Sequence, residues 1–200
     1  MMKSTLRTKA VCTTAFIFLL LVIDQALKLW VKTTFRLGED REILPFFHLL
    51  FVENNGMAFG MEIGRKFFLT LFRIIASGLL TWYIVRCIRR NRSWLTLVCV
   101  SLILAGAVGN IIDCVFYGVW FDYAGWMNGR VVDMLYFPLI HGTFWNWIPW
   151  IGGEDFVFFA PVFNFADSCI TIGVFIALIF EKTLFESSGR NIQSDTTTCA

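Results

Sequence analysis

The sequence predicts an all-α polytopic membrane protein with four transmembrane helices, and its composition and its apolar segments both predict this class. Of the 200 residues, 57% are hydrophobic and only 16% are charged, whereas a soluble domain carries roughly 25% charged residues. The mean hydropathy is +0.67. Four apolar stretches are long enough to cross a bilayer, which takes about 20 helical residues. This composition excludes disordered, collagen-like and basic nucleic-acid-binding proteins, so no nucleic acid is expected as a partner.

Each predicted span carries a few polar residues. The spans cover about residues 10–35, 67–85, 94–113 and 161–185. Their polar residues are, in order, Asp24, Gln25 and Lys28, then Arg73, then Asn110 and Asp113, then Asn164 and Asp167. No small-residue cleavage site follows the first span, so it is interpreted as a retained helix rather than a removed signal peptide. Residues 1–185 then form one membrane-embedded domain, and the polar residues 186–200 form a disordered tail.

The distribution of Lys and Arg in the loops predicts the orientation of the chain. The N-terminal tail has three cations and no acid, and the 86–93 loop has four Arg and no acid. The 114–160 loop has one Arg against four acids. We therefore expect both termini on the cytoplasmic side (N-in, C-in) and the two long loops, 34–66 and 114–160, on the outer side.

Four carboxylates are predicted at one depth, near the outer leaflet. Asp113 lies about 20 residues into a helix that begins inside, and the rise of 1.5 Å per residue takes it to the outer boundary. Asp167 lies near the outer start of its helix, Asp24 lies in the outer half of the first span, and Asp133 ends the outer-loop motif Gly-Arg-Val-Val-Asp. Ionisable groups at this depth are costly and usually mark a functional site.

Structural explanations for the same residues stay open. Asp24 and Lys28 are four positions apart and can form a helix-face ion pair that anchors the first span. The Asn–Asp pairs that end at Asp113 and Asp167 can act as polar contacts between helices. Two such pairs together with Asp133 favour chemistry, because two carboxyls that share one proton can supply both an acid and a base to hydrolysis.

Other chemistries have little support in the sequence. His48 and His141 lie in no zinc motif, and the cysteines show no metal-ligand spacing. No serine-nucleophile motif and no phosphate-binding glycine loop is present. No metal or cofactor is therefore expected, and carboxylate chemistry remains.

Five motifs resemble those of signal peptidase II, the lipoprotein signal peptidase family, in the same order. They are Asp24-Gln25-x-x-Lys28, Asn54-Asn55-Gly56-Met57-Ala58-Phe59, Gly109-Asn110-Ile111-Ile112-Asp113, Val131-Val132-Asp133 and Phe163-Asn164-Phe165-Ala166-Asp167-Ser168. Each motif alone is weak, but five in this order on four spans are highly specific. The resemblance extends from about Ile23 to Gly173.

The resemblance implies an intramembrane aspartyl endopeptidase of the bacterial cytoplasmic (inner) membrane. The substrate would be a prolipoprotein whose cysteine carries a diacylglyceryl group, and cleavage would occur just N-terminal to that cysteine. The catalytic dyad would be Asp133 and Asp167. The residues that shape the site or bind substrate would be Asp24, Lys28, Asn54, Gly56, Asn110, Asp113 and Asn164. The resemblance also implies a small extracytoplasmic β-sheet on the membrane surface, an active site toward the outer leaflet, contact with membrane lipids and inhibition by globomycin-type compounds.

Two departures from the family pattern matter. The family usually has Arg after the aspartate of its third motif, and here the residue is Cys114. Arg73 lies at a similar depth and is a candidate for the missing cation near Asp113; alternatively, it extends to the outer headgroups.

The segment between the two dyad aspartates is also longer than usual and rich in Trp around residues 144–150. It is expected at the membrane interface, either as a rim or lid of the site or as an anchor alone.

Two other functions compete with proteolysis. A small proton-coupled transporter would also carry carboxylates in the membrane. Against it, these carboxylates cluster at one face instead of lining a path, and no inverted repeat is visible. A non-catalytic assembly factor would tolerate loss of the dyad carboxylates. The five motifs favour the peptidase over both.

Overall fold

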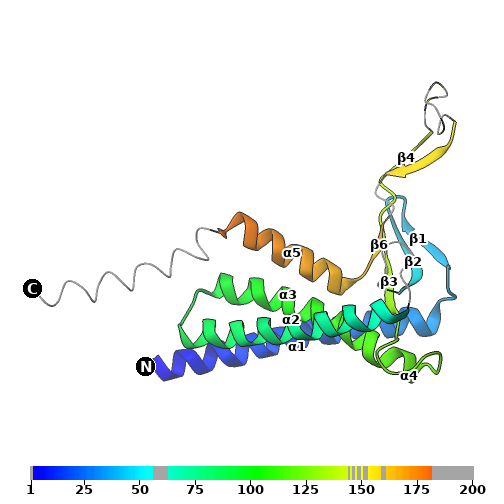
Figure 1. Cartoon of the computed structure of the whole chain (residues 1–200). Coiled ribbons are helices and arrows are strands. Elements are labelled where there is room, and N and C mark those ends of the chain that lie inside the picture. The colour runs from blue at the N-terminus through cyan, green and yellow to red at the C-terminus, as the bar shows by residue number, and fades with distance from the viewer. Residues whose placement is uncertain are drawn as a thin grey trace, which may run out of the picture.

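The protein is a bundle of helices with a small β-sheet at one end (Figure 1). The computed structural model describes residues 2–55, 63–143, 145, 147, 150, 153–158 and 161–181. Its long helices are α1 (Met2–Thr34), α2 (Ile63–Arg89), α3 (Trp94–Ile112) and α5 (Phe165–Ile179). The predicted tail 186–200 and the site candidate Gly56 lie outside the described residues.

Three helical stretches are long and apolar enough to cross a membrane. They are Lys3–Thr34, Phe67–Arg89 and Trp94–Trp120, and they correspond to the first three predicted spans. Helix α5 is apolar but has only 15 residues, so the fourth span, 161–185, stays a prediction. The mostly helical fold of a multi-pass membrane protein is confirmed.

Helix α3 is the centre of the bundle and packs against α1, α2 and α5. Its first turn is capped by Ser93, whose side chain accepts a hydrogen bond from the backbone N–H of Thr96. At its other end it continues as a π-helix, η1 (Asp113–Tyr117), and then as the short α4 (Gly118–Trp120). Such π-helical turns are frequent at functional sites.

The predicted small antiparallel sheet is present. Four strands pair in the order β1 (Asp40–Leu44), β2 (Phe47–Asn54), β3 (Val131–Tyr136) and β6 (Val162–Phe163). A separate two-stranded sheet joins β4 (Ile140–Thr143) to β5 (Asp155–Phe158). The four-stranded sheet positions two of the predicted site residues, Asp133 and Asn164. Asp133 lies on β3, opposite Val52 of β2, and Asn164 directly follows β6 and directly precedes α5.

A buried apolar cluster fastens this sheet to the helix ends. Its members come from α1 and the residue after it, β2, η1 and β3, and they are Val31, Phe35, Phe51, Tyr117, Val132 and Met134. Burial of a large apolar side chain contributes about 1.5–3 kcal/mol, so the cluster is sufficient to hold the sheet in place. The strand that carries Asp133 therefore packs directly against the helix ends.

Glycines allow α1 and α5 to approach α3 closely. A Cβ atom on Gly109 would lie 2.5 Å from Oδ2 of Asp24, and one on Gly106 would lie 2.3 Å from the backbone oxygen of Ala166. Small residues at helix contacts are typical of membrane bundles, where close backbone approach drives association.

The substitution Gly109→Ala is expected to lower the free energy of unfolding by about 1–3 kcal/mol, because the added methyl group overpacks the contact with Asp24. Gly78→Ala in α2 is the matched control, since nothing lies within 4 Å of its added Cβ. That variant should be neutral or gain up to about 1 kcal/mol from better helix propensity. Denaturant unfolding in detergent measures both, and equal responses would contradict the packing explanation.

Candidate active site

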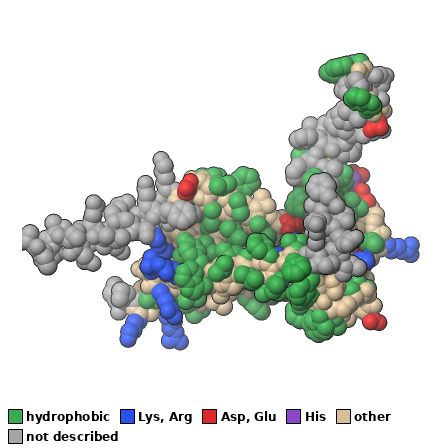
Figure 2. Space-filling view, in the orientation of Figure 1, with side chains coloured by type: hydrophobic (Ala, Val, Ile, Leu, Met, Phe, Trp, Pro, Cys, Tyr) green, Lys and Arg blue, Asp and Glu red, His purple; other side chains and the backbone are tan. Residues whose placement is uncertain are grey.

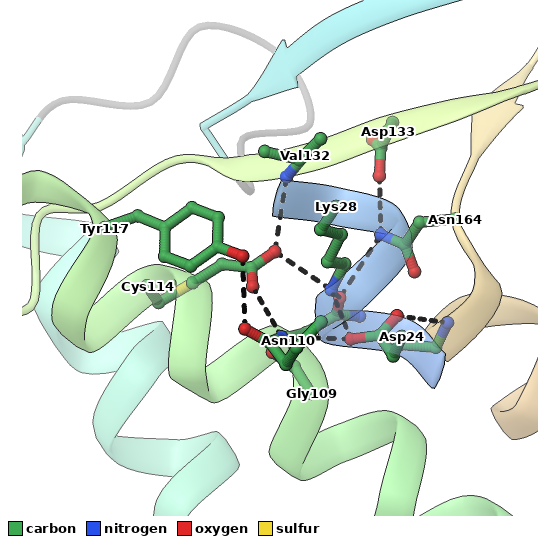
Figure 3. A network of polar contacts seen from close by, with 12 residues as sticks. Asp24, Lys28, Gly109, Asn110, Cys114, Tyr117, Val132, Asp133 and Asn164 are labelled. Atoms are coloured by element: carbon green, nitrogen blue, oxygen red, sulfur yellow. Dashed lines mark hydrogen bonds and ion pairs between the residues drawn. The ribbon is translucent and has the colours of Figure 1, made fainter. Parts of the chain in front are cut away.

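Asn164 joins the two aspartates that the family motifs mark as the dyad, and Figure 3 shows its side chain next to Asp133. Its Nδ2 donates to Oδ1 of Asp133 at 2.6 Å, and its Oδ1 accepts from the backbone N–H of Asp167 at 2.9 Å. Asn164 is the N-cap of α5 and forms a capping box with Asp167. Because the backbone N–H can only donate, Oδ1 of Asn164 must face it, and the amide N–H₂ must face Asp133.

Asp133 is buried and accepts hydrogen bonds on both carboxyl oxygens. Asn164 binds one oxygen, and Nδ2 of Asn54 donates to the other at 3.0 Å. Burial raises the pKa of Asp133 to about 6; the hydrogen bond from Asn54 acts against this rise, and the nearby charge of Asp167 adds to it. A carboxyl with this pKa is suited to proton transfer near neutral pH.

Asp167 is held by Asn110 on helix α3. Nδ2 of Asn110 donates to Oδ1 of Asp167 at 2.7 Å. Oδ1 of Asn110 accepts from Nζ of Lys28 at 2.9 Å and from Nδ2 of Asn164 at 3.2 Å. The ammonium of Lys28 has only donors, so it orients the Asn110 amide with its N–H₂ toward Asp167.

Lys28 lies at the centre of the network and is fully buried. Its Nζ forms ion pairs with Asp24 at 3.0 Å and with Asp113 at 2.9 Å. The ion pair between positions 24 and 28 that the spacing allowed is therefore present. The lysine also binds the end of α3, so it does more than anchor α1.

The two carboxylates paired with Lys28 hold the backbone beside the dyad. Oδ1 of Asp24 accepts from the N–H of Ala166 at 3.0 Å, one residue before Asp167. Oδ2 of Asp113 accepts from the N–H of Val132 at 3.3 Å, one residue before Asp133. One buried ammonium thus connects the supports of both dyad residues.

Sequence reasoning missed two members of this network. Nε2 of Gln25 donates to Oδ1 of Asp113 at 3.0 Å, and the hydroxyl of Tyr117 donates to Oε1 of Gln25 at 3.1 Å. Gln25 lies in the first motif, which was a usable signal. Tyr117 had none, because it lies on η1, where the π-helical turn breaks the α-helical spacing.

A second charged cluster was also missed. Glu53 of β2 forms ion pairs with Lys32 of α1 and, at 2.9 Å, with Nη1 of Arg130. Burial tends to raise the pKa of Glu53, but hydrogen bonds from Lys32 and Arg130 lower it overall. Tyr123 accepts from the backbone N–H of Arg130 at 2.8 Å. The cluster connects α1 to β2 and to the residue that precedes β3.

Arg73 approaches Cys114 from helix α2. Its Nη1 donates to Sγ of Cys114 at 3.4 Å. Asp113 forms its ion pair with Lys28, and Arg73 lies beside position 114, where the family usually has Arg. Within the described part of the chain, no group of three or more His, Cys, Asp or Glu residues is arranged to hold a metal ion.

Comparison with known proteins decides the family of this site. The model of the signal peptidase (SPase) II family matches residues 16–183. The chain belongs to the signal peptidase II family. A lipoprotein signal peptidase of Porphyromonas gingivalis is 52% identical over 181 residues, covering 82% of this chain and 80% of the relative. One from Amoebophilus asiaticus is 40% identical over 178 residues, covering 82% and 75%.

A solved structure of a bacterial membrane enzyme is similar to this signal peptidase in fold. It superposes with a TM-score of 0.62 at 27% identity, and the match covers 84% of this chain and 90% of the other. The family makes the protein a protease, a hydrolase that cleaves signal peptides, and the transporter and assembly-factor alternatives are set aside.

Proposed function

We propose that this signal peptidase removes the signal peptide from diacylglyceryl-modified bacterial prolipoproteins, with Asp133 and Asp167 as its catalytic dyad. Cleavage occurs just N-terminal to the lipidated cysteine. The observation that carries the proposal is the bridge through Asn164, whose side-chain amide donates to the carboxyl of Asp133 and whose backbone N–H donates to the carboxyl of Asp167.

The dyad hydrolyses the peptide bond by general acid–base catalysis. One carboxylate takes a proton from the attacking water, while the protonated partner donates to the carbonyl oxygen. The resulting tetrahedral intermediate collapses with breakage of the C–N bond, and a dyad proton passes to the departing amine. The titration of two such groups belongs to the pair rather than to either residue.

The other polar residues of the motifs position this dyad. Asn54, Asn110 and Asn164 orient the carboxyl oxygens, and Asp24, Lys28 and Asp113 hold the backbone beside them. Gly56 is proposed to contact substrate and lies outside the described residues. All of these groups serve one peptidase domain of residues 1–185, and no cofactor takes part.

The site is proposed to face the outer leaflet of the bacterial cytoplasmic (inner) membrane. Figure 2 shows Lys and Arg gathered at the helix ends remote from the sheet, and hydrophobic side chains between these ends and the sheet. Trp30, Trp120 and Trp126 are exposed near the sheet, as expected of an interfacial aromatic belt. In this proposal both termini lie on the cytoplasmic side and α5 is the fourth span. The signal helix of the substrate then reaches the dyad laterally, from the lipid bilayer. Globomycin-type inhibitors would occupy the same position.

We propose that Arg73 supplies to this site the cation that most of the family carries at the position of Cys114. Arg73→Leu is expected to lower the cleavage rate about 10-fold, the effect of about 1.4 kcal/mol in the barrier. Arg73→Leu with Cys114→Arg should regain most of that loss. Full activity of the single variant, measured with lipidated prolipoprotein, would leave Arg73 as a residue that contacts headgroups only.

Cleavage of a purified prolipoprotein tests the substrate assignment. The enzyme in detergent should cleave the diacylglyceryl-modified form, seen as a gel shift, and cleave the unmodified form at least about 100-fold more slowly, since acyl-chain binding contributes to recognition of the transition state. Equal cleavage of the two forms would contradict the lipid requirement. No cleavage of either would contradict the proposed function.

A further inference from the structure

The β4–β5 hairpin forms an arm that projects from the four-stranded sheet. Along the chain it lies between the two dyad aspartates. It begins after β3, which carries Asp133, and returns through β6 to Asn164 and α5. Its root is fixed, because β3 and β6 pair through Leu135 with Phe163. The arm itself extends beyond the bundle (Figure 1), and none of its described residues takes part in the polar contacts around the dyad.

The end of the arm exposes three tryptophans. The exposed fractions are 70% for Trp145, 74% for Trp147 and 97% for Trp150. The rings of Trp145 and Trp147 lie 6.0 Å apart. The backbone of Trp150 has a φ of 67°, a left-handed conformation that is strained for a bulky residue. Exposed, strained Trp at a hairpin end is unfavourable in water and indicates a contact surface.

The apolar surface continues at the root of the arm. The turn between β1 and β2 exposes Leu44 and Phe46, and the segment before β4 exposes Leu139. These two segments are neighbours, because the rings of Phe47 and Phe137 stack at 4.9 Å. We call the exposed side chains at the root and at the end together the arm strip; they are Leu44, Phe46, Leu139, Trp145, Trp147 and Trp150.

The direction and charge of the arm identify what covers it. In Figure 1 the arm runs across the helix axes, on the side of α5, instead of continuing along them. With the helices crossing the bilayer, the arm therefore follows the membrane surface at the level of the sheet. Residues 131–160 contain no Lys or Arg, whereas Glu154 is exposed. Trp prefers the interface without needing anionic lipid, and a cation-free strip suits zwitterionic headgroups.

We propose that the arm strip binds the headgroup layer of the outer leaflet and that the β4–β5 hairpin is a lateral membrane anchor beside the active site. The proposal rests on the membrane placement in the proposed function. The anchor holds β3 and β6, and with them both dyad aspartates, at a constant depth relative to the lipid surface. The lipidated cysteine of the substrate lies at the same depth in the membrane. The anchor therefore keeps the dyad at the depth of the scissile bond.

Quenching of Trp fluorescence tests the anchor. Wild type and the triple variant Trp145→Ser, Trp147→Ser, Trp150→Ser are placed in phosphatidylcholine nanodiscs, and the difference of their emission spectra isolates the arm. Lipid brominated near the headgroup should remove at least about half of that difference emission, as for other interfacial Trp, while aqueous acrylamide removes little. Trp120→Ser is the matched control, since Trp120 is 58% exposed and lies in α4, at the same end of the bundle as the sheet (Figure 1).

Two outcomes would overturn the anchor. Strong quenching by acrylamide with none by brominated lipid would place the arm in water. Insensitivity to both quenchers would mean that protein, such as a second copy of the chain, covers the tryptophans. The measurement needs no substrate, so its failure leaves the cleavage assay untouched, and failed cleavage with brominated-lipid quenching would count against the proposed function alone.

Discussion

Asp133→Asn and Asp167→Asn are each expected to reduce cleavage of lipidated prolipoprotein by at least about 10³-fold, within the range that general acid–base groups contribute. Each variant keeps the shape of the side chain but removes a group that can gain and lose a proton. Asp122→Asn, on an exposed residue between α4 and β3, is the matched control and should cleave as wild type does. Activity that survives either dyad substitution in folded protein would make Asp113 the next candidate.

The pH profile separates a chemical role of Asp133 from a structural one. Because its pKa is raised to about 6, Asp133 loses its charge at a higher pH than an ordinary aspartate does. If the carboxylate is the base, kcat/KM falls as the pH drops below about 6. Asn54 donates to that carboxylate, so Asn54→Ala should raise the pKa further and move the acidic limb to higher pH. An acidic limb that stays in place would argue against Asp133 as the titrating group.

Lys28→Met is expected to lower the free energy of unfolding by about 3–5 kcal/mol, because it leaves Asp24 and Asp113 as buried carboxylates without a cation. Cleavage should fall with it, since Asn110 loses the donor that orients its amide toward Asp167. Lys3→Met removes the same charge from an exposed position of the same helix and should change stability by less than about 0.5 kcal/mol. Denaturant unfolding in detergent measures both variants.

A double variant shows whether uncompensated charge causes that loss. Adding Asp113→Asn to Lys28→Met removes one of the two stranded carboxylates. We expect the double variant to be more stable than the sum of the two single losses predicts, by a coupling of about 0.5–3 kcal/mol. Purely additive losses would mean that lysine packing, rather than its charge, explains the effect.

The local patterns of the sequence predicted much of this fold. Three predicted spans correspond to long apolar helices, because the bilayer sets a length and an apolarity that can be read along the chain. The spacing between Asp24 and Lys28 allowed an ion pair, and that pair is present at 3.0 Å. The five motifs placed the protein in its family. The fourth span, 161–185, stays a prediction, because the described part of α5 has 15 residues and the chain is described only as far as residue 181.

The contacts that build the site were decided by the tertiary structure. Lys28 reaches Asp113 as well as Asp24, Asn164 stands between the dyad aspartates, and Tyr117 turns inward on a π-helix. Each contact depends on how helices rotate about their axes and how strands register against one another. Apolar periodicity leaves both free when most of a helix surface is hydrophobic. The sequence by itself determined which polar groups lie in the membrane-embedded part of the chain. The packing of helices and strands, including the close contacts at Gly106 and Gly109, decided which of these groups meet.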